Sequence, residues 1–234
     1  ILTRVARSHI RVGTFQFAAL KQDRETIQTL LEYTINRHHP EIGGSQNKPL
    51  SLLEAVIEKQ AELITHWMRV GFIHGVMNTD NMALSGETID YGPCAFMDTY
   101  DPGTVFSSID HGGRYAYANQ PAIAQWNLAR LAETMLPLLD DEIEKAADTI
   151  EEVVNGFGLL YKDKWLSMMR AKLGLFGVRA EDESLINDLL GWMQRVGADY
   201  TNTFHHLTEE KIPQGEPYND RAFKEWYTHW QEQL

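Results

Sequence analysis

Cysteine is almost absent from this chain, and long apolar runs are missing altogether. The single cysteine, Cys94, excludes an internal disulfide framework and is typical of a reducing compartment, so we expect a cytoplasmic protein. No apolar stretch approaches the roughly 18 residues that a membrane helix requires. The glycine-rich phosphate-binding motifs GxGxxG, GxxxxGKS and GxxxxGKT do not occur either.

Basic residues are also in short supply. The chain has 21 Lys and Arg against 33 Asp and Glu, which gives a formal net charge of −12. A nucleic-acid backbone binds net basic faces, so we expect no nucleic-acid partner. Because no apolar run is long enough for a membrane helix, we also expect no membrane partner. The charge does not exclude a nucleotide, which needs only a few well-placed cations and a metal ion. With 43% hydrophobic residues, the 234 residues can bury a sizeable core.

Helical spacing of apolar residues dominates what is present and predicts a mainly α fold. Ser51 and Glu54 match a capping box at the start of a long helix that ends near Gly71. By contrast, residues 1–18 alternate as a strand does, although Gly13 and Thr14 offer a helix-start or turn signal. Residues 93–118 form an irregular loop. The predicted helices cover about 23–37, 51–71, 121–139, 164–173, 182–196 and 220–233, and a further one starts at the acidic residues 140–142.

One loop carries the strongest chemical signal. His74 and Asn81 are seven residues apart, as in the His-x-Asp-x-x-x-x-Asn loop of kinase-like phosphotransferases, where the Asp takes a proton and the Asn holds magnesium. The usual Asp position holds Val76, and a carboxylate stands instead at Asp80. We expect His74 to be a buried structural residue. The metal-holding half of a kinase site is therefore present, and its base is displaced.

A second metal ligand follows nine residues after Asn81. Asp90-Tyr91-Gly92 matches the Asp-x-Gly that holds metal in kinase-like enzymes, although this tripeptide alone also occurs in ordinary turns. Ser85-Gly86 predicts a hairpin turn between the two ligands. Such a hairpin would bring Asn81 and Asp90 to the same end of two short strands, where both could reach one cation.

Several motifs in the same order resemble the selenoprotein O family, whose bacterial members are called YdiU. The resemblance is dense from residue 1 to about 140, and beyond that only general helical character remains. The matching stretches are residues 3–17, 74–82, 90–93 (DYGP), 100–103 (YDPG), 113–115 (GRY) and 119–122 (NQPA).

The resemblance implies a protein-kinase-like C-lobe over residues 1–234, mainly α, with a short β-hairpin carrying the metal site. It also implies a protein adenylyltransferase, a pseudokinase by fold that moves AMP from ATP to Ser, Thr or Tyr hydroxyls of other proteins. The implied cofactor is Mg²⁺, with Mn²⁺ as the other candidate.

The resemblance assigns a role to five residues of this sequence. Asp80 corresponds to the proton acceptor, Asn81 and Asp90 to the magnesium ligands, and Arg4 and Arg11 to arginines that contact the nucleotide phosphates. The chemistry agrees, since Mg²⁺ favours oxygen ligands and the guanidinium fork matches phosphate geometry. From the residues alone, other interpretations stay open: Asp80 caps the loop or orders Asn81, and both arginines are surface charges.

Part of a kinase-like site is missing. Such folds hold ATP with a glycine-rich loop, a lysine and its glutamate partner, which in the resembled family precede the point where this chain starts. Because the chain begins at Ile1 without an initiator Met, we expect a fragment that alone binds ATP weakly and is weakly active or inactive. Two other functions stay open, a kinase-type phosphotransferase with the same metal ligands and a non-catalytic scaffold.

Overall fold

The protein is mainly α, as the apolar spacing predicted. The computed structural model describes residues 3–139, 143–209 and 214–234. Its elements are α1 (Val12–Ala19), α2 (Arg24–His38), α3 (Lys48–Arg69), β1 (Phe72–Ile73), β2 (Ala95–Phe96), α4 (Gln120–Leu139), α5 (Ile143–Asn155), α6 (Phe157–Lys172), α7 (Asp182–Val196), α8 (Tyr200–His206) and α9 (Arg221–Gln233). In the described residues, no helix has the length and apolar character needed to cross a membrane.

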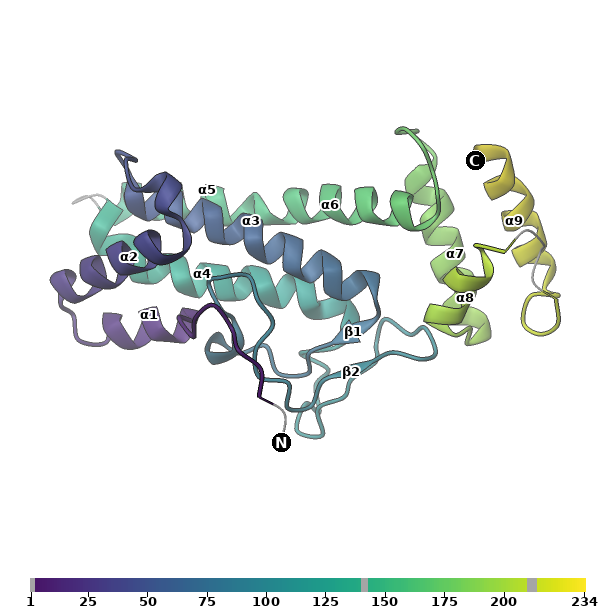
Figure 1. The fold of residues 1–234 in the computed structure, drawn as a ribbon, viewed down its shortest axis with the longest axis horizontal. Coiled ribbons are helices and arrows are strands. Elements are labelled where there is room, and N and C mark those ends of the chain that lie inside the picture. Colours follow the sequence, from purple (N-terminus) through teal and green to yellow (C-terminus); the bar gives the residue numbers. More distant parts are fainter. Residues whose placement is uncertain (1–2, 140–142, 210–213) are drawn as a thin grey trace.

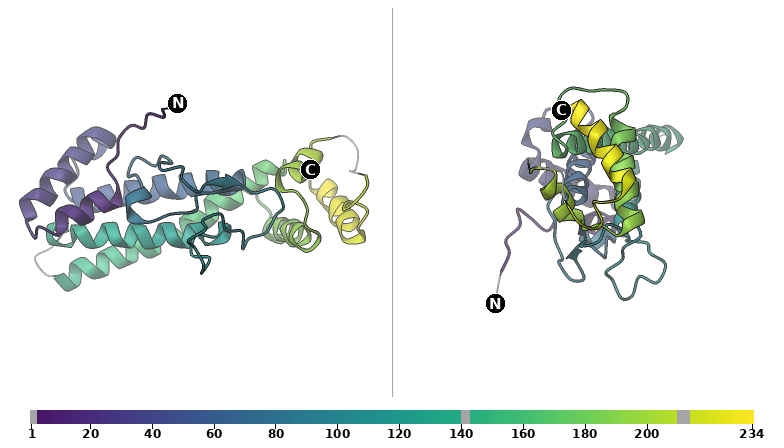
Figure 2. Two further views of the ribbon diagram at one scale, coloured as in Figure 1. Left: turned by 90° about the horizontal axis from the view of Figure 1, so that it is seen from below. Right: turned by 90° about the vertical axis from the view of Figure 1, so that its right-hand side faces the viewer.

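Helix α3 is the centre of the core. It packs against α4 and α6 along its length, while α1 and α2 lie at one end of the molecule and α7, α8 and α9 at the other (Figure 1). Its fully buried side chains include Leu52, Leu53, Val56, Ala61 and Ile64. Each large apolar side chain buried in this way contributes about 1.5–3 kcal/mol. The molecule is therefore an elongated bundle, with its irregular segments along one side (Figure 2).

The start of α3 differs from the prediction. The helix begins at Lys48, and Asn47 is the capping residue, because its side-chain oxygen accepts a hydrogen bond from Leu50 N at 3.2 Å. Pro49 fits the first turn, where an N–H would have no partner in any case. The capping box predicted at Ser51 and Glu54 therefore lies inside the helix.

The end of α3 is closed by side chains from distant parts of the chain. The Met68 carbonyl accepts hydrogen bonds from the hydroxyls of Tyr117 and Tyr200, at 2.7 and 2.8 Å. The Arg69 carbonyl accepts one from the Lys172 ammonium. The last carbonyls of a helix have no partner within it, and these three donors supply one. Gly71 then turns the chain away at φ +69°.

The predicted strand over residues 1–18 is only partly present. Residues 10–12 lie in extended form beside residues 82–84, with hydrogen bonds from Val12 N to Met82 O and from Leu84 N to Ile10 O. From Val12 the chain forms α1, whose Phe15 is fully buried. A helix forms here instead of a strand because its buried side packs against α2 and α4.

The predicted hairpin is present in reduced form. Gly86 N donates to Ala83 O in a tight turn, and a single bridge pairs Met82 with Thr88. The paired strands proper are β1 and β2, which are antiparallel and lie on either side of this segment in sequence. Asn81 therefore ends a short 3-10 helix (Thr79–Asn81) and Asp90 lies in a loop, and neither is at the end of a paired strand.

The C-terminal half agrees closely with the helical spacing. Helices α7 and α9 have nearly the predicted bounds, and Gly197 closes α7 in the left-handed conformation at φ +67°. Helix α6 starts seven residues earlier than predicted, at Phe157, and the short helix α8 was not predicted. The predicted helix start at residues 140–142 lies outside the described residues.

We predict that Gln120→Met lowers the free energy of unfolding by roughly 2–4 kcal/mol. The fully buried Gln120 side chain accepts a hydrogen bond from His74 N at 3.0 Å and donates one to Phe72 O at 2.9 Å. Methionine fills the same space but leaves both main-chain groups buried without a partner. Urea unfolding followed by circular dichroism measures the change. Gln28→Met, at a partly exposed position on α2, is the control and should change stability by less than about 0.5 kcal/mol.

Candidate functional site

The loop from His74 to Asn81 is organised around the His74 ring. This ring is completely buried and lies against Trp67, with 5.3 Å between ring centroids. Its Nε2 lies 2.8 Å from Ile89 O, and its Nδ1 lies 3.4 Å from Val76 N. A carbonyl can only accept, so Nε2 carries the proton and Nδ1 accepts from the Val76 amide. The ring thereby joins the loop to the residue immediately before Asp90, and the predicted structural role of His74 is confirmed.

Burial keeps this histidine neutral. It lowers the pKa of His74 below the ordinary 6.5, and the Ile89 carbonyl and the charge of Asp90 only partly oppose that effect. The neutral form has one donor and one acceptor, which the two hydrogen bonds of the ring require. Protonation would remove the acceptor and break the contact with Val76.

Val76 contributes its main chain rather than its side chain. Its N–H donates to His74, and its carbonyl accepts a hydrogen bond from Asn81 Nδ2 at 2.9 Å. The amide of the largely buried Asn81 is therefore fixed, and its oxygen is the atom left for another partner. An aspartate at position 76 is not needed for this arrangement, because the two contacts use backbone atoms.

Asp90 lies at the other end of the same network. It directly follows Ile89, whose carbonyl is bonded to His74, and its own backbone has φ +56°, which is uncommon for a residue other than glycine. Its side chain is exposed. One exposed carboxylate and one oriented amide oxygen fit a hard cation that takes its remaining ligands from phosphate and water.

The described residues contain no cluster of side chains that could hold a metal ion by itself. Among residues 3–139, 143–209 and 214–234, no group of three His, Cys, Asp or Glu side chains could hold a metal ion. Mg²⁺ commonly takes one or two protein oxygens and completes its coordination with phosphate oxygens and water, so the prediction for Asn81 and Asp90 does not need a third protein ligand.

The carboxylate of Asp80 lies against the first turn of α1. A Cβ atom added at Gly13 would lie 2.3 Å from Asp80 Oδ1 and 3.1 Å from the carboxyl carbon, so only glycine leaves room for this rotamer. The positive end of the helix dipole favours a negative charge there. In the described residues, the Asp80 side chain makes no hydrogen bond or ion pair, whereas Asn78 caps the turn by accepting from Asp80 N at 3.1 Å.

The two arginines lie along the segment from Asp80 to Tyr91. Arg11 Nη1 donates to Asp80 O at 3.1 Å, and its buried Nε has no hydrogen-bond partner among the described residues. Arg4 Nη1 donates to Thr88 O at 2.7 Å, and its guanidinium lies 4.8 Å from the centre of the Tyr91 ring. The structure thus connects both arginines to the segment that contains Asp80, Asn81 and Asp90. The ligands they bind stay predictions.

Comparison with known proteins decides the family. The family model described as protein adenylyltransferase SelO matches residues 1–234. The chain belongs to the SelO family. The match covers every residue, so it extends well beyond the first 140 positions where the motifs are dense.

Relatives in this family carry the name protein nucleotidyltransferase YdiU. The one from Nitrosococcus oceani is 61% identical over 234 residues, and those from Alcanivorax borkumensis and Bacillus cytotoxicus are each 57% identical. In each case all of this chain is matched, against 48% of the relative. The chain therefore spans about half the length of the curated relatives it matches.

The sequence analysis assigned no role to three residues that support the site in the structure, Gln120, Asn127 and Gly13. Gln120 fixes the main chain at Phe72 and His74, and Asn127 Nδ2 donates to Met77 O at 2.9 Å. Gly13 leaves room for Asp80. Gln120 and Asn127 lie about two helical turns apart on the buried side of α4, and a polar residue on such a side was the available signal.

We predict that His74 makes the protein less stable as the pH falls. Its pKa is lowered in the folded state, so below about pH 6.5 the unfolded chain binds a proton that the folded chain does not. Stability is then lost by up to about 1.4 kcal/mol per pH unit until the folded pKa is reached. Urea unfolding between about pH 7.5 and 5.5 measures this slope.

His74→Gln should flatten the slope, whatever its effect on stability at neutral pH. Burial also lowers the pKa of His38, so this histidine should likewise make the protein less stable as the pH falls. His38→Gln is therefore the matched comparison. Equal slopes in the wild type and the His74 variant would contradict a buried neutral His74.

Proposed function

We propose that the protein containing this chain transfers AMP from Mg²⁺-bound ATP to Ser, Thr or Tyr hydroxyls of other proteins. The observation that carries the proposal is the network from Ile89 through His74 and Val76 to Asn81, which holds the Asn81 amide and connects it to the residue immediately before Asp90. Membership of a family described as protein adenylyltransferase supports the type of group transferred.

Asn81 and Asp90 are the proposed metal ligands. When bound, Mg²⁺ or Mn²⁺ would neutralise charge on the phosphates during in-line displacement. Arg11 and Arg4 add positive charge at the two ends of the same segment, and the buried, unpartnered Nε of Arg11 is a donor that a phosphate oxygen would satisfy.

Asp80 is the proposed proton acceptor. The acceptor hydroxyl oxygen forms a bond to the α-phosphorus of ATP, the bond to the pyrophosphate oxygen breaks, and the hydroxyl proton moves to the Asp80 carboxylate. The products are the AMP-modified protein and pyrophosphate. The exposed carboxylate is free of competing hydrogen bonds in the described residues, so it can meet an incoming hydroxyl. Asn78 performs the capping role that was the alternative for Asp80.

We predict that the full-length protein, incubated with ATP, Mg²⁺ and a mixture of protein acceptors, adds AMP and not phosphate. Intact-protein mass spectrometry separates the two, because AMP is far heavier than a phosphoryl group. Asp90→Asn should reduce the rate at least about 100-fold, since a metal ligand is lost. The exposed Asp163→Asn on α6 removes the same charge elsewhere and should leave the rate unchanged.

Two other outcomes identify the alternatives. Addition of phosphate would indicate a kinase-type phosphotransferase that uses the same ligands. If Asp90→Asn left both the modification pattern and the cellular effects of the protein unchanged, a non-catalytic scaffold would replace the enzyme.

We predict that Gly13→Ala lowers the transfer rate without lowering stability. The added methyl group takes the place of Asp80 Oδ1, and a surface carboxylate can rotate away at little cost. Alanine in a helix is favoured over glycine by about 1 kcal/mol, so the fold should be retained or strengthened. Because Asp80 is displaced, kcat should fall at least about tenfold, the usual lower range for a misplaced general base.

The matched control for this variant is Gly191→Ala. Gly191 lies inside α7, and a Cβ added there meets nothing within 4 Å. Thermal unfolding and the transfer rate are measured for both variants. A Gly13→Ala enzyme with wild-type kcat would show that the position of Asp80 against α1 does not matter for the reaction.

A further inference from the structure

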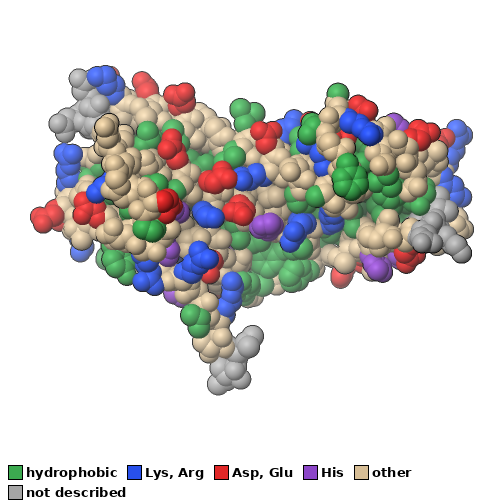
Figure 3. All heavy atoms as spheres, turned by 45° about the horizontal axis from the view of Figure 1, so that its top comes forward, with side chains coloured by type: hydrophobic (Ala, Val, Ile, Leu, Met, Phe, Trp, Pro, Cys, Tyr) green, Lys and Arg blue, Asp and Glu red, His purple; other side chains and the backbone are tan. Residues whose placement is uncertain are grey.

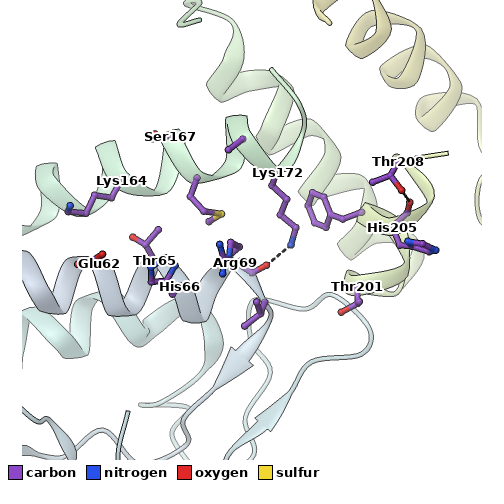
Figure 4. Close-up of a pocket in the computed structure, with 14 residues that line it drawn as sticks. Glu62, Thr65, His66, Arg69, Lys164, Ser167, Lys172, Thr201, His205 and Thr208 are labelled. Carbon is purple, nitrogen blue, oxygen red and sulfur yellow. Dashed lines mark hydrogen bonds between the residues drawn. The ribbon is translucent and has the colours of Figure 1, made fainter. Parts of the chain in front are cut away.

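A hollow of about 830 Å³ lies between the C-terminal half of α3, α6 and α8, and it contains none of the five residues proposed to act on the nucleotide. Figure 4 shows its lining, with Lys172 reaching across from α6 toward the end of α3 and His205 on the α8 side. The outer surface here is a mixture of charged and hydrophobic side chains (Figure 3). No step of the proposed transfer reaction uses this hollow.

The charged side chains that line the hollow are mostly basic, whereas the chain as a whole is acidic. Its lining includes one acidic side chain against several basic ones, in a chain whose formal net charge is −12. The acidic residue, Glu62, pairs with Lys59 at 3.4 Å on the same helix. The charged and titratable side chains facing the hollow are Glu62, His66 and Arg69 from α3, Lys164 and Lys172 from α6, and His205 from α8.

Lys164 is already neutralised, because it forms an ion pair with Glu58 at 2.5 Å. Arg69 and Lys172 form no such ion pair with the residues that the structure describes. Within the residues that the structure describes, neither side chain has a carboxylate within ion-pairing distance. Two basic side chains, Arg69 and Lys172, therefore lie next to each other in a recess without a carboxylate partner among the described residues.

Lys172 is held in an unusual environment for a cation. Its Nζ lies 4.1 Å from the centre of the Tyr200 ring and 3.8 Å from that of Phe204, and it donates to the Arg69 carbonyl. Burial lowers the pKa of Lys172 to about 7, and the positive charge of Arg69 acts in the same direction. The two ring faces oppose this effect, because they attract the ammonium form. An anion beside Lys172 would stabilise that form much further.

The rest of the lining suits a ligand with an apolar part. The lining includes the apolar side chains of Met168, Ala171, Val70 and Phe204 and the hydroxyl-bearing side chains of Ser167 and Thr201. A hollow that combines apolar walls with a few placed charges is typical of small-molecule sites.

We propose that the hollow between α3, α6 and α8 binds a small organic anion, a phosphate ester or carboxylate with an apolar or aromatic part, through Arg69 and Lys172. The anion would lie between the two cations, and its apolar part against Phe204 and Met168. This site is separate from the Asp80, Asn81 and Asp90 site and does not rest on the proposed transfer reaction.

The two sites nevertheless share a ridge of α3. His66, Arg69 and Val70 also line a smaller neighbouring hollow of about 300 Å³, whose opposite wall includes Thr88 and Tyr91. Tyr91 follows Asp90 and carries the stacked Arg4. A ligand that fixes Arg69 therefore binds to the same turn of α3 that borders the candidate active site.

Calorimetric titration of the full-length protein, without nucleotide or metal, tests the proposal. The probes are phenyl phosphate, benzoate and the uncharged benzyl alcohol. We expect one or both anions to bind in the hollow and the alcohol to bind far more weakly. The anion with the higher affinity shows whether the site prefers a phosphate ester or a carboxylate. Arg69→Gln and Lys172→Met should each weaken the anion at least about tenfold, as expected for loss of a charge-assisted hydrogen bond.

Lys162→Met is the matched control. Lys162 lies on the same helix and pairs with Glu183, but it does not line the hollow, so this variant should bind like the wild type. Arg69 is exposed, so its variant keeps the test valid if Lys172→Met weakens the fold. The proposal is overturned if neither anion binds at millimolar concentration, or if Arg69→Gln and Lys162→Met bind them equally well.

Discussion

The buried ring of His74 is the constraint on which the rest of the site depends. One of its nitrogen atoms holds the main chain before Asp90, and the other holds the main chain at Val76, which in turn orients Asn81. Segments separated by 15 positions are thereby fixed relative to each other by a single side chain. The ring can do this only while it is neutral, and burial under Trp67 and Phe72 keeps it so.

The base of this loop is fixed in turn by the way α3 ends. Tyr117, Tyr200 and Lys172 donate to its last carbonyls, so three separate segments meet where the loop starts. Tyr100 and Tyr117 pack on Tyr200 and close the space around that end. A disturbance in the C-terminal helices would therefore reach the loop through hydrogen bonds to α3 as well as through packing. The same end of α3 carries Arg69, which places the anion-binding hollow directly beside the support of the site.

The helices that sequence reasoning predicted well have strong local signals. Helix α2 begins after Asp23, whose carboxylate accepts from Glu25 N, and α7 ends at a left-handed glycine. Apolar spacing then sets their buried sides. The predictions that were wrong concern places where local signals compete: Ser51 and Glu54 form a plausible cap, but Asn47 followed by Pro49 starts the helix one turn earlier. Residues 1–18 alternate like a strand, while Gly13 and Thr14 offer a helix-start signal, and packing against α2 and α4 favours a helix from Val12.

The sequence by itself determined the residue types of the site, their order and spacing, and the family. The seven-residue interval from His74 to Asn81 and the shift of the carboxylate from position 76 to Asp80 are properties of the chain before it folds. Only the tertiary structure decided which groups meet. Pairing of residues 10–12 with 82–84 brings Arg11 and Gly13 to Asp80, and the packing of α3, α6 and α8 brings together two cations about 100 positions apart. The physical reason is that such neighbours are set by burial and by pairing across long separations, which leave no periodic signal in the sequence.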